Sequence, residues 1–202
     1  MNDLHIEALV QAALCLNAGE KEQAKHLIQE RYPFIPVAAN KRKYSVKEMI
    51  NQFFQDGFID RYSGQRLINP GMLRVMSEEL NDIFPYHPHW KTDACHIAYW
   101  EWQPTIDHII PVSLGGIDDS SNWVTTSMMN NLAKGNFTLE QLGWTLKEKG
   151  DIRQWDGLSK LFVQAAERDV ALLDIPRINA YYRATKVMLK AVKKRGLIIT
   201  IV

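Results

Sequence analysis

The stretch from Asp107 to Asn131 contains side chains that could support hydrolytic chemistry. Asp107 and His108 are neighbours, and Asn122 and Asn131 follow a short way along the chain. A histidine with a pKa near its ordinary value of ~6.5 can accept a proton from water at neutral pH. Carboxylate and amide oxygens are hard ligands that suit Mg²⁺ or Mn²⁺. The stretch therefore combines a candidate general base with a candidate site for a divalent cation.

A strand, a loop, a second strand and a helix are predicted around these residues. Residue types predict short strands over 105–110 and 122–126, with a polar, glycine-containing loop over 111–121 between them. Ser127 is a good N-cap, and residues 128–134 provide two helical turns after it. The segment is therefore expected to fold as a β–loop–β–α unit.

Side-chain alternation in the first strand separates the two candidate groups. Successive strand residues point to opposite faces, so Asp107 and His108 are expected on different sides. Asp107 can then meet Asn131 of the helix and share a cation with it. If the helix register shifts by one residue, Asn130 takes the place of Asn131.

This segment resembles the catalytic motif of HNH nucleases, also called ββα-metal nucleases. In that family the first strand ends in Asp-His or His-His, a Gly-Gly loop follows, Asn opens the second strand, and the helix carries His or Asn shortly before Lys-Gly. The chain matches this order and spacing with Asp107-His108, Gly115-Gly116, Asn122, Asn131 and Lys134-Gly135. A looser similarity to bacterial HNH proteins covers about residues 58–158 and leaves out both ends of the chain.

The resemblance implies a role for each matched residue. His108 would be the general base, with Nδ1–H donating to the carbonyl of Asn122 and Nε2 free to accept a proton. The side chain of Asn122 would hold the loop, and Asp107 and Asn131 would bind one divalent cation. Mg²⁺ or Mn²⁺ fits best, with Zn²⁺ or Ni²⁺ as alternatives. Lys134 is a candidate phosphate contact, or a helix-end cation favoured by the helix dipole.

Two features depart from the usual family pattern. Asn131 stands where many members have His, which weakens the expected metal affinity. Many relatives also bind a structural zinc through two CxxC pairs, but Ser127 and Asn130 occupy aligned positions here, so no structural zinc is expected. Cys15 and Cys95 are far apart in the sequence, and both are expected to be free thiols.

The implied activity is metal-dependent hydrolysis of phosphodiester bonds by an endonuclease, with double-stranded DNA as the expected partner. A catalytically silent DNA- or protein-binding module on the same scaffold is one alternative. A nuclease directed at RNA, or one acting as a toxin, is another. Target sequence, base modification, nicking versus double-strand cleavage, oligomeric state and pathway stay open.

Positive charge concentrates near the C-terminus. The formal net charge is only +1, yet the residues from 175 onward include seven Lys or Arg and no Asp or Glu. A basic face on one helix is therefore predicted, with Arg183, Lys186 and Lys190 as candidate nucleic-acid contacts. The alternative is an ordinary solvated helix face.

The rest of the chain predicts an α+β fold, mostly helical, around the ββα-metal core. Three parts are expected: a helical hairpin over 1–39, the nuclease core over 40–155, and C-terminal helices with a terminal strand over 156–202. Within them the sequence predicts a capped helix after Ser45, a β-hairpin in FIDRYSGQRLI, an amphipathic helix that residues 155–158 introduce and that runs to about 173, and a long helix after Pro176.

Other features limit the class of protein. Hydrophobic residues make up 46% of the chain and charged residues 23%, as in ordinary globular proteins. No apolar run approaches the ~18 residues of a membrane helix, and the N-terminus lacks a signal-peptide pattern, so a cytoplasmic protein without membrane contact is expected.

The terminal helices could serve a partner protein or a dimer. The aromatic residues between Trp90 and Trp102 are expected to form core, with base stacking as the alternative.

Overall fold

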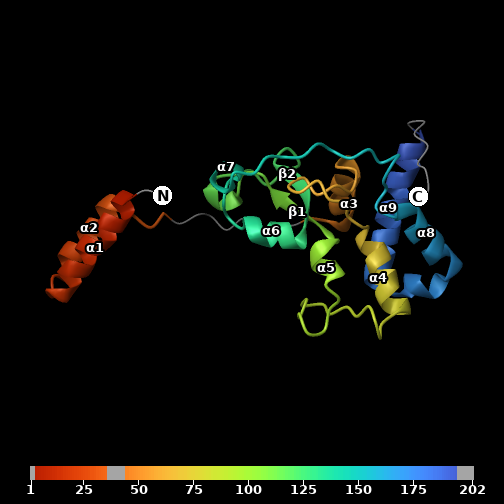
Figure 1. Cartoon of the computed structure of the whole chain (residues 1–202), viewed down its shortest axis with the longest axis horizontal. Helices are drawn as coiled ribbons and strands as arrows, with labels where there is room; N and C mark the ends of the chain where they lie inside the picture. The colour runs from red at the N-terminus through yellow and green to blue at the C-terminus, as the bar shows by residue number, and fades with distance from the viewer. Residues whose placement is uncertain (1–2, 36–43, 195–202) are drawn as a thin grey trace. The chain divides into compact units, whose positions relative to one another are not determined.

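The computed structural model of the chain describes residues 3–35 and 44–194. Within these residues the fold is α+β and mostly helical, as predicted, with one two-stranded antiparallel sheet (Figure 1). The chain divides into two compact units, Met1–Lys41 and Arg42–Val202. Each unit is described by itself below.

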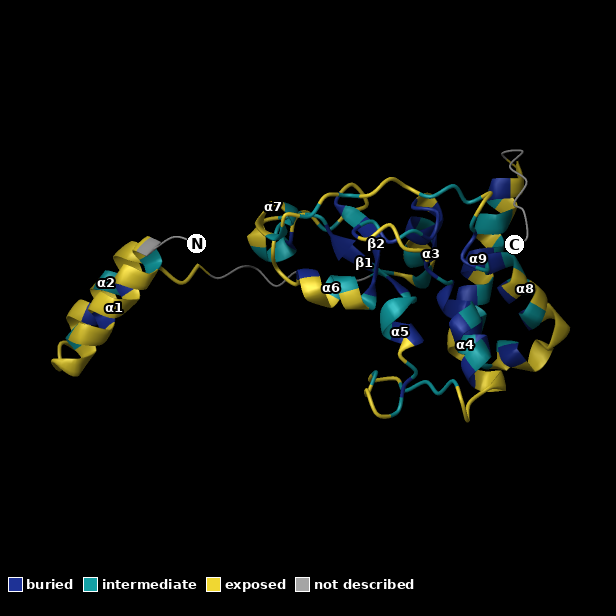
Figure 2. Ribbon diagram, in the orientation of Figure 1, coloured by how far each residue is buried: buried dark blue, intermediate teal, exposed yellow. Residues whose placement is uncertain are grey.

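The first unit is a helical hairpin, as predicted. Helix α1 (Asp3–Asn17) and helix α2 (Lys21–Arg31) contact each other, and the Arg31 guanidinium donates to Gln11 Oε1 at 2.8 Å. The buried apolar residues in its described part are Ala8, Ala12 and Ala24. Large apolar side chains of α1 are instead exposed (Figure 2), and they are Leu4, Ile6, Leu9, Val10, Leu14 and Leu16.

The second unit contains both strands and a larger core. Its strands are β1 (Pro104–His108) and β2 (Trp123–Ser127). Its helices are α3 (Val46–Gln55), α4 (Pro70–Glu79), α5 (Ala98–Glu101), α6 (Met128–Lys134), α7 (Leu139–Leu142), α8 (Ser159–Arg168) and α9 (Pro176–Lys194), with 3₁₀ turns at Val112–Leu114 and Val170–Asp174. The main core includes fully buried Phe53, Phe58, Phe162 and Ile178.

Helix α3 lies between the sheet and α9 and contacts both (Figure 1). The predicted capping box starts it: the Ser45 backbone N–H donates to Glu48 Oε2 at 2.8 Å, and the Glu48 N–H donates to Ser45 Oγ at 3.2 Å. Ile50, Phe53 and Phe54 lie on its buried face. The first element of the unit is therefore fixed by local sequence and by one apolar stripe.

The C-terminal helices do not form the separate part that was predicted over 156–202. Ile178, Tyr181 and Val192 of α9 are buried in the same core cluster as Phe53 of α3. An apolar face shared with α3 merges these helices with the preceding residues into one unit. The predicted terminal strand lies outside the described residues.

Two other elements are shorter than predicted. The expected β-hairpin around residues 58–68 is present as one antiparallel bridge between Ile59 and Arg66, with the Asp60 N–H donating to the Gln65 carbonyl and the Leu67 N–H to the Phe58 carbonyl, each at 2.8 Å. The helix that was expected to follow residues 155–158 and run to about residue 173 begins at Ser159 and ends at Arg168.

The start of α8 at Ser159 follows from the backbone before it. Gly157 and Leu158 have φ angles of 63° each, in the left-handed region that an α-helix cannot use. At the other end, Asp169 accepts a hydrogen bond from the Ala171 N–H at 3.1 Å and starts the 3₁₀ turn. The positive φ angles before Ser159 set the start of α8, and the capping carboxylate of Asp169 marks its end.

The aromatic segment forms core, as predicted. Trp90 and Trp100 pack around fully buried Tyr99, whose hydroxyl donates to the carbonyl of Leu73 at 2.9 Å. Burial raises the pKa of Tyr99 to about 12. Among the described residues, no helix combines the length and apolar composition that crossing a lipid bilayer requires.

Candidate active site

The candidate site is built on β1, β2 and α6. The two strands pair in antiparallel register, with Asp107 opposite Val124 and His108 opposite Trp123. The Ser127 side chain accepts a hydrogen bond from the Asn130 N–H at 3.1 Å and starts α6 at Met128, as predicted. The order strand, loop, strand, helix is therefore confirmed.

The side chain of Asn122 ties the loop between the strands to the end of β1. Its Oδ1 accepts from the Ile110 N–H, and its Nδ2 donates to the carbonyls of Ile110 and Ile117, each at 2.9 Å. Gly116 lies against the same place, since a Cβ there would be 1.9 Å from the Ile110 carbonyl oxygen. The loop is thus closely packed.

Asp107 is held on one side of β1 by two donors. Lys134 Nζ lies 3.0 Å from Asp107 Oδ2, and the hydroxyl of Tyr62 donates to the same oxygen at 2.7 Å. Burial and the neighbouring Asp107 carboxylate raise the pKa of Tyr62 far above its ordinary value, so the phenol stays protonated and remains a donor. Asp107 therefore has a buried cation and a neutral donor beside it.

Lys134 does not occupy the surface position that its predicted phosphate contact requires. The side chain is fully buried, and its ammonium group donates to the His108 carbonyl oxygen at 2.8 Å as well as pairing with Asp107. A buried ammonium group needs such partners, and here they turn the side chain inward. Lys134 is accordingly a structural cation of the site in this conformation.

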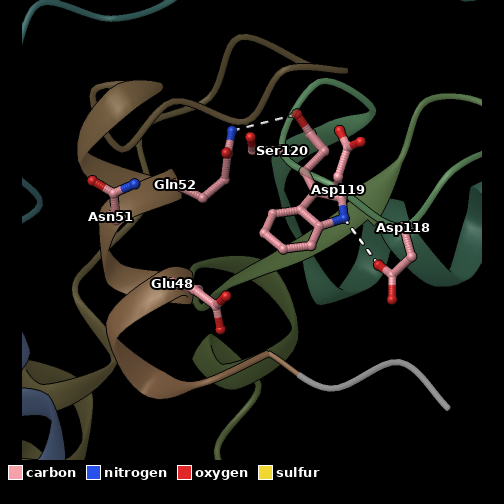
Figure 3. Close-up of a pocket in the computed structure, with 7 residues that line it drawn as sticks. Glu48, Asn51, Gln52, Asp118, Asp119 and Ser120 are labelled. Carbon is pink, nitrogen blue, oxygen red and sulfur yellow. Dashed lines mark hydrogen bonds between the residues drawn. The ribbon is translucent and has the colours of Figure 1, made fainter.

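His108 lies on the other side of β1 and is also buried, with 2% of its surface exposed. Its Nε2 is 2.8 Å from Asp118 Oδ1. The indole N–H of Trp123 donates to the same oxygen at 3.1 Å, as the dashed line to Asp118 in Figure 3 shows.

This geometry contradicts the predicted orientation of the imidazole. The carbonyl of Asn122 accepts from the Ile109 N–H at 2.9 Å, and within the described part of the chain no hydrogen bond from His108 Nδ1 to that carbonyl is present. The nitrogen that was expected to be free is instead the one bonded to Asp118. A loop carboxylate therefore replaces a backbone carbonyl as the partner of the ring.

Asn131 and Asn130 have different partners. Asn131 Nδ2 donates to Thr105 Oγ1 at 3.0 Å and to the Ile106 carbonyl at 3.2 Å, whereas Asn130 Nδ2 donates to Asp60 Oδ2 at 2.8 Å. The Ile106 carbonyl is only an acceptor, which identifies the Asn131 atom facing it as the amide nitrogen. Asn131 therefore faces the residues directly before Asp107, whereas Asn130 faces Asp60.

The side-chain oxygens of Asp107 and Asn131 are of the type that a hard cation prefers. Among the described residues, the polar contacts of Asp107 use Oδ2 and those of Asn131 use Nδ2, which leaves Oδ1 of each side chain for a ligand. The described residues contain no group of three His, Cys, Asp or Glu that could hold a metal. Two protein oxygens suit Mg²⁺, which usually keeps several waters.

Two buried carboxylates, which the sequence analysis missed, position β2. Asp56 Oδ2 accepts from the Thr125 N–H at 2.9 Å, and Asp60 Oδ2 accepts from the Ser127 N–H at 2.8 Å. Asp56 also pairs with Arg61 at 3.0 Å. Both carboxylates are fully buried and belong to the scaffold that carries the site.

A pocket of about 360 Å³ lies on the Asp118 side of the sheet. Its walls come from α3, the loop and β2 (Figure 3), and the lining residues are Glu48, Asn51, Gln52, Asp118, Asp119, Ser120 and Trp123. The carboxylates make this wall acidic. The pocket therefore reaches the partner of His108 and not the imidazole itself.

The basic face of α9 (Arg183, Lys186, Lys190, Lys193 and Lys194) lies opposite its buried face. Arg183 and Lys190 are exposed, while Lys186 pairs with Glu167 at 2.8 Å. That hydrogen bond lowers the pKa of Glu167 and raises the pKa of Lys186. Since α3 lies between α9 and the sheet, this face does not adjoin His108.

The histidines before β1 have other contacts. His96 stacks on Phe84, with ring centroids 4.3 Å apart. His87 Nδ1 accepts a hydrogen bond from the His89 N–H at 3.1 Å.

Tyr62 and Asp118 are the site residues that sequence reasoning missed. Asp118 lies ten positions after His108 within the predicted polar loop, where polarity alone did not distinguish it from Asp119. Tyr62 reaches Asp107 across 45 positions, and no local pattern signals such a contact. Both cysteines are free in the structure, as predicted.

Comparison with protein-family models, with curated proteins and with solved structures gave no match for this chain.

Proposed function

We propose that the chain is a metal-dependent endonuclease that hydrolyses phosphodiester bonds in DNA by a one-cation HNH-type mechanism. The observation that supports it is the β1–loop–β2–α6 unit, which carries Asp107 and His108 at the end of β1, Asn122 directly before β2 and Asn131 in α6. A lone Asp-His pair is weak evidence. The ordered set, with the Asn122 bridge in place, is more specific.

His108 is the proposed general base. Its imidazole would take a proton from the attacking water, and the backbone around it is held by the bond from Lys134 to the His108 carbonyl. The ring is covered in this conformation, so contact with a phosphate requires some movement around it. Asn122 keeps the loop beside β1 during that movement.

Asp107 and Asn131 are the proposed ligands of the cation. When bound, a divalent cation supplies charge neutralisation at the phosphate and the leaving oxygen. The Tyr62 phenol and the Lys134 ammonium group hold one Asp107 oxygen and thereby orient the other. Thr105 and Ile106 orient the Asn131 amide in the same way.

The basic face of α9 is the proposed grip on the nucleic-acid backbone. Arg183 and Lys190 are exposed there, and exposed cations on one helix face attract phosphates without reading sequence. Lys186 is already paired with Glu167, so its contribution is expected to be smaller. Because this face is away from the sheet, it would contact a different part of the nucleic acid from the cleaved bond.

Cleavage of supercoiled plasmid tests the proposal. Purified protein is incubated with Mg²⁺, Mn²⁺, Ni²⁺ or Zn²⁺, and with EDTA, and the products are mapped on a sequencing gel. Metal-dependent nicking is expected, and His108→Ala should lower its rate by about 10²–10⁴-fold. A structured RNA assayed in parallel decides between the two nucleic acids.

His26→Ala is the matched control, because His26 is an exposed histidine on α2 in the other unit. It should cleave like the wild type. Cleavage that persists in EDTA would contradict the cation role, and equal rates for His108→Ala and wild type would remove the base assignment.

A catalytically silent nucleic-acid- or protein-binding module is the second candidate. The observation that favours it is the closed state of the site: Asp118 caps His108, and Lys134 pairs with Asp107. Under this alternative, neither the wild type nor His108→Ala cleaves the plasmid with any of the four metals, while both proteins still bind DNA.

A further inference from the structure

We infer that Asp118 is a positioning residue that fixes the orientation and the tautomer of the His108 ring, keeping the proton on Nε2 and leaving the lone pair on Nδ1. An ionised carboxylate can only accept a hydrogen bond. The 2.8 Å contact between Asp118 Oδ1 and His108 Nε2 therefore requires a proton on that nitrogen. In a neutral imidazole the other nitrogen then carries the lone pair.

Asp118 itself is held in place by neighbours on β2 and in the loop. Trp123 lies opposite His108 in the strand register and donates its indole N–H to the same Asp118 oxygen at 3.1 Å. Figure 3 shows this bond beside the pocket. The Trp123 ring meets the Tyr44 ring edge-on, at a centroid distance of 5.0 Å.

The loop backbone is fixed as well. The carbonyl of Ile117, directly before Asp118, accepts from Asn122 Nδ2 at 2.9 Å, and Gly116 packs against the Ile110 carbonyl. Asp118 is thus held at its side chain by Trp123 and at the backbone before it by Asn122. A carboxylate held in this way suits a permanent partner of the His108 ring better than a lid that opens. This is why the geometry favours a positioning role over a gate.

The catalytic consequence rests on the proposed function. With Asp118 present, every His108 ring offers a lone pair on the same atom, Nδ1. Without it, the ring divides between two tautomers and two orientations, and part of the population presents the wrong atom. A fall in kcat with little change in KM is expected, since the substrate contacts are unaffected.

The tautomer can be measured without any cleavage assay. Long-range ¹H–¹⁵N spectra of the intact protein, labelled at histidine, identify which ring nitrogen carries the proton, and the spectrum of His108→Ala assigns the signal. In wild type we expect the proton on Nε2. In Asp118→Ala we expect the mixture of tautomers seen in free histidine, and in Asp118→Asn, which keeps one acceptor oxygen, an intermediate result.

Cleavage rates test the consequence. Asp118→Ala should lower kcat by about 10–100-fold, the usual cost of losing a group that orients a functional histidine. Asp118→Asn should recover part of this loss. Asp119→Asn is the matched control, because the contact of Asp119 is with the Ser121 backbone N–H at 2.7 Å; it should change neither the spectrum nor kcat.

Two results would overturn the inference. One is a wild-type spectrum with the proton on Nδ1, and the other is an Asp118→Ala variant that keeps both the wild-type spectrum and the wild-type kcat. If the wild type cleaves no nucleic acid, the proposed function fails, while the spectra still decide whether Asp118 fixes the ring.

Discussion

The two sides of β1 hold adjacent residues by opposite means. Asp107 is an anion held by a cation and a phenol, Lys134 and Tyr62, while His108 is a potential cation held by an anion, Asp118. The Lys134 side chain is fully buried, whereas that of Asp118 is 22% exposed. Water can therefore take the place of a lost Asp118 side chain more easily than that of a lost Lys134 side chain.

This difference separates stability from function at neighbouring positions. A buried charge that loses its partner stays uncompensated, and the cost appears in the free energy of unfolding. Loss of a partly exposed partner costs less free energy of unfolding, and its main effect is on the orientation of the group that it held. Substitutions on the Asp107 side of β1 should therefore mainly change stability, and substitutions on the His108 side should mainly change the orientation of the ring.

Lys134→Met should have the largest effect on stability. It leaves the Asp107 carboxylate buried without its cation, and the expected loss is about 3–5 kcal/mol in the free energy of unfolding. Urea denaturation measures it. Lys147→Met, at an exposed lysine, should change stability by less than about 0.5 kcal/mol. Similar losses for the two variants would contradict the importance of the buried pair.

Tyr62→Phe should have the next largest effect. It removes the hydroxyl donor to Asp107 but keeps the ring and its contact with Trp144. A hydrogen bond to a charged group contributes about 1.5–3 kcal/mol, and denaturation should show a loss in that range. Tyr32→Phe, at an exposed tyrosine of the first unit, is the control. An unchanged midpoint for Tyr62→Phe would show that Lys134 alone holds Asp107.

Gly116→Ala tests the packing of the loop that carries Asp118. Its Cβ would meet the Ile110 carbonyl oxygen at 1.9 Å, so the loop must shift, at a cost of about 1–3 kcal/mol. Gly115→Ala has open space but a φ of 88°, so it should cost about 1 kcal/mol through backbone strain alone. If Gly115→Ala proved the more damaging of the two by urea denaturation, close packing at residue 116 would not be what fixes the loop.

Asp118→Asn should have the smallest effect on stability. The amide keeps the shape of the carboxylate, and its partial exposure allows water to assist, so we expect a loss of about 0.5–1.5 kcal/mol. Thermal unfolding of this variant and of Lys134→Met in the same buffer gives the comparison directly. A greater loss for Asp118→Asn than for Lys134→Met would reverse the contrast between the two sides.

Local pattern was enough to predict the elements of the site. The strands, the Ser127 cap and the extent of α6 follow from residues close together in sequence, as does the capping box at Ser45. The short hairpin around residues 58–68 also follows from local sequence, but its attachment to β2 through the Arg61 N–H was not predicted. That attachment depends on a strand more than 50 positions away, as the bond to Thr125 shows.

The partners of the site residues could not be predicted in this way. Lys134 at the end of a short helix has the sequence signature of a surface cation, yet tertiary packing turns it inward. The choice of Asp118 rather than Asp119 as the partner of His108 depends on where the Trp123 indole lies. Such contacts are decided by three-dimensional packing, which spacing along the chain does not record.

The buried ammonium group of Lys134 has a consequence for how the protein matures. Small metalloproteins often stay unfolded until the ion arrives, because their anionic ligands repel one another without it. Here an internal counter-ion already neutralises Asp107, the proposed ligand, so the proposed site does not need a metal ion for the chain to fold. Chelation should then switch off the proposed cleavage reversibly while leaving circular dichroism and melting temperature unchanged.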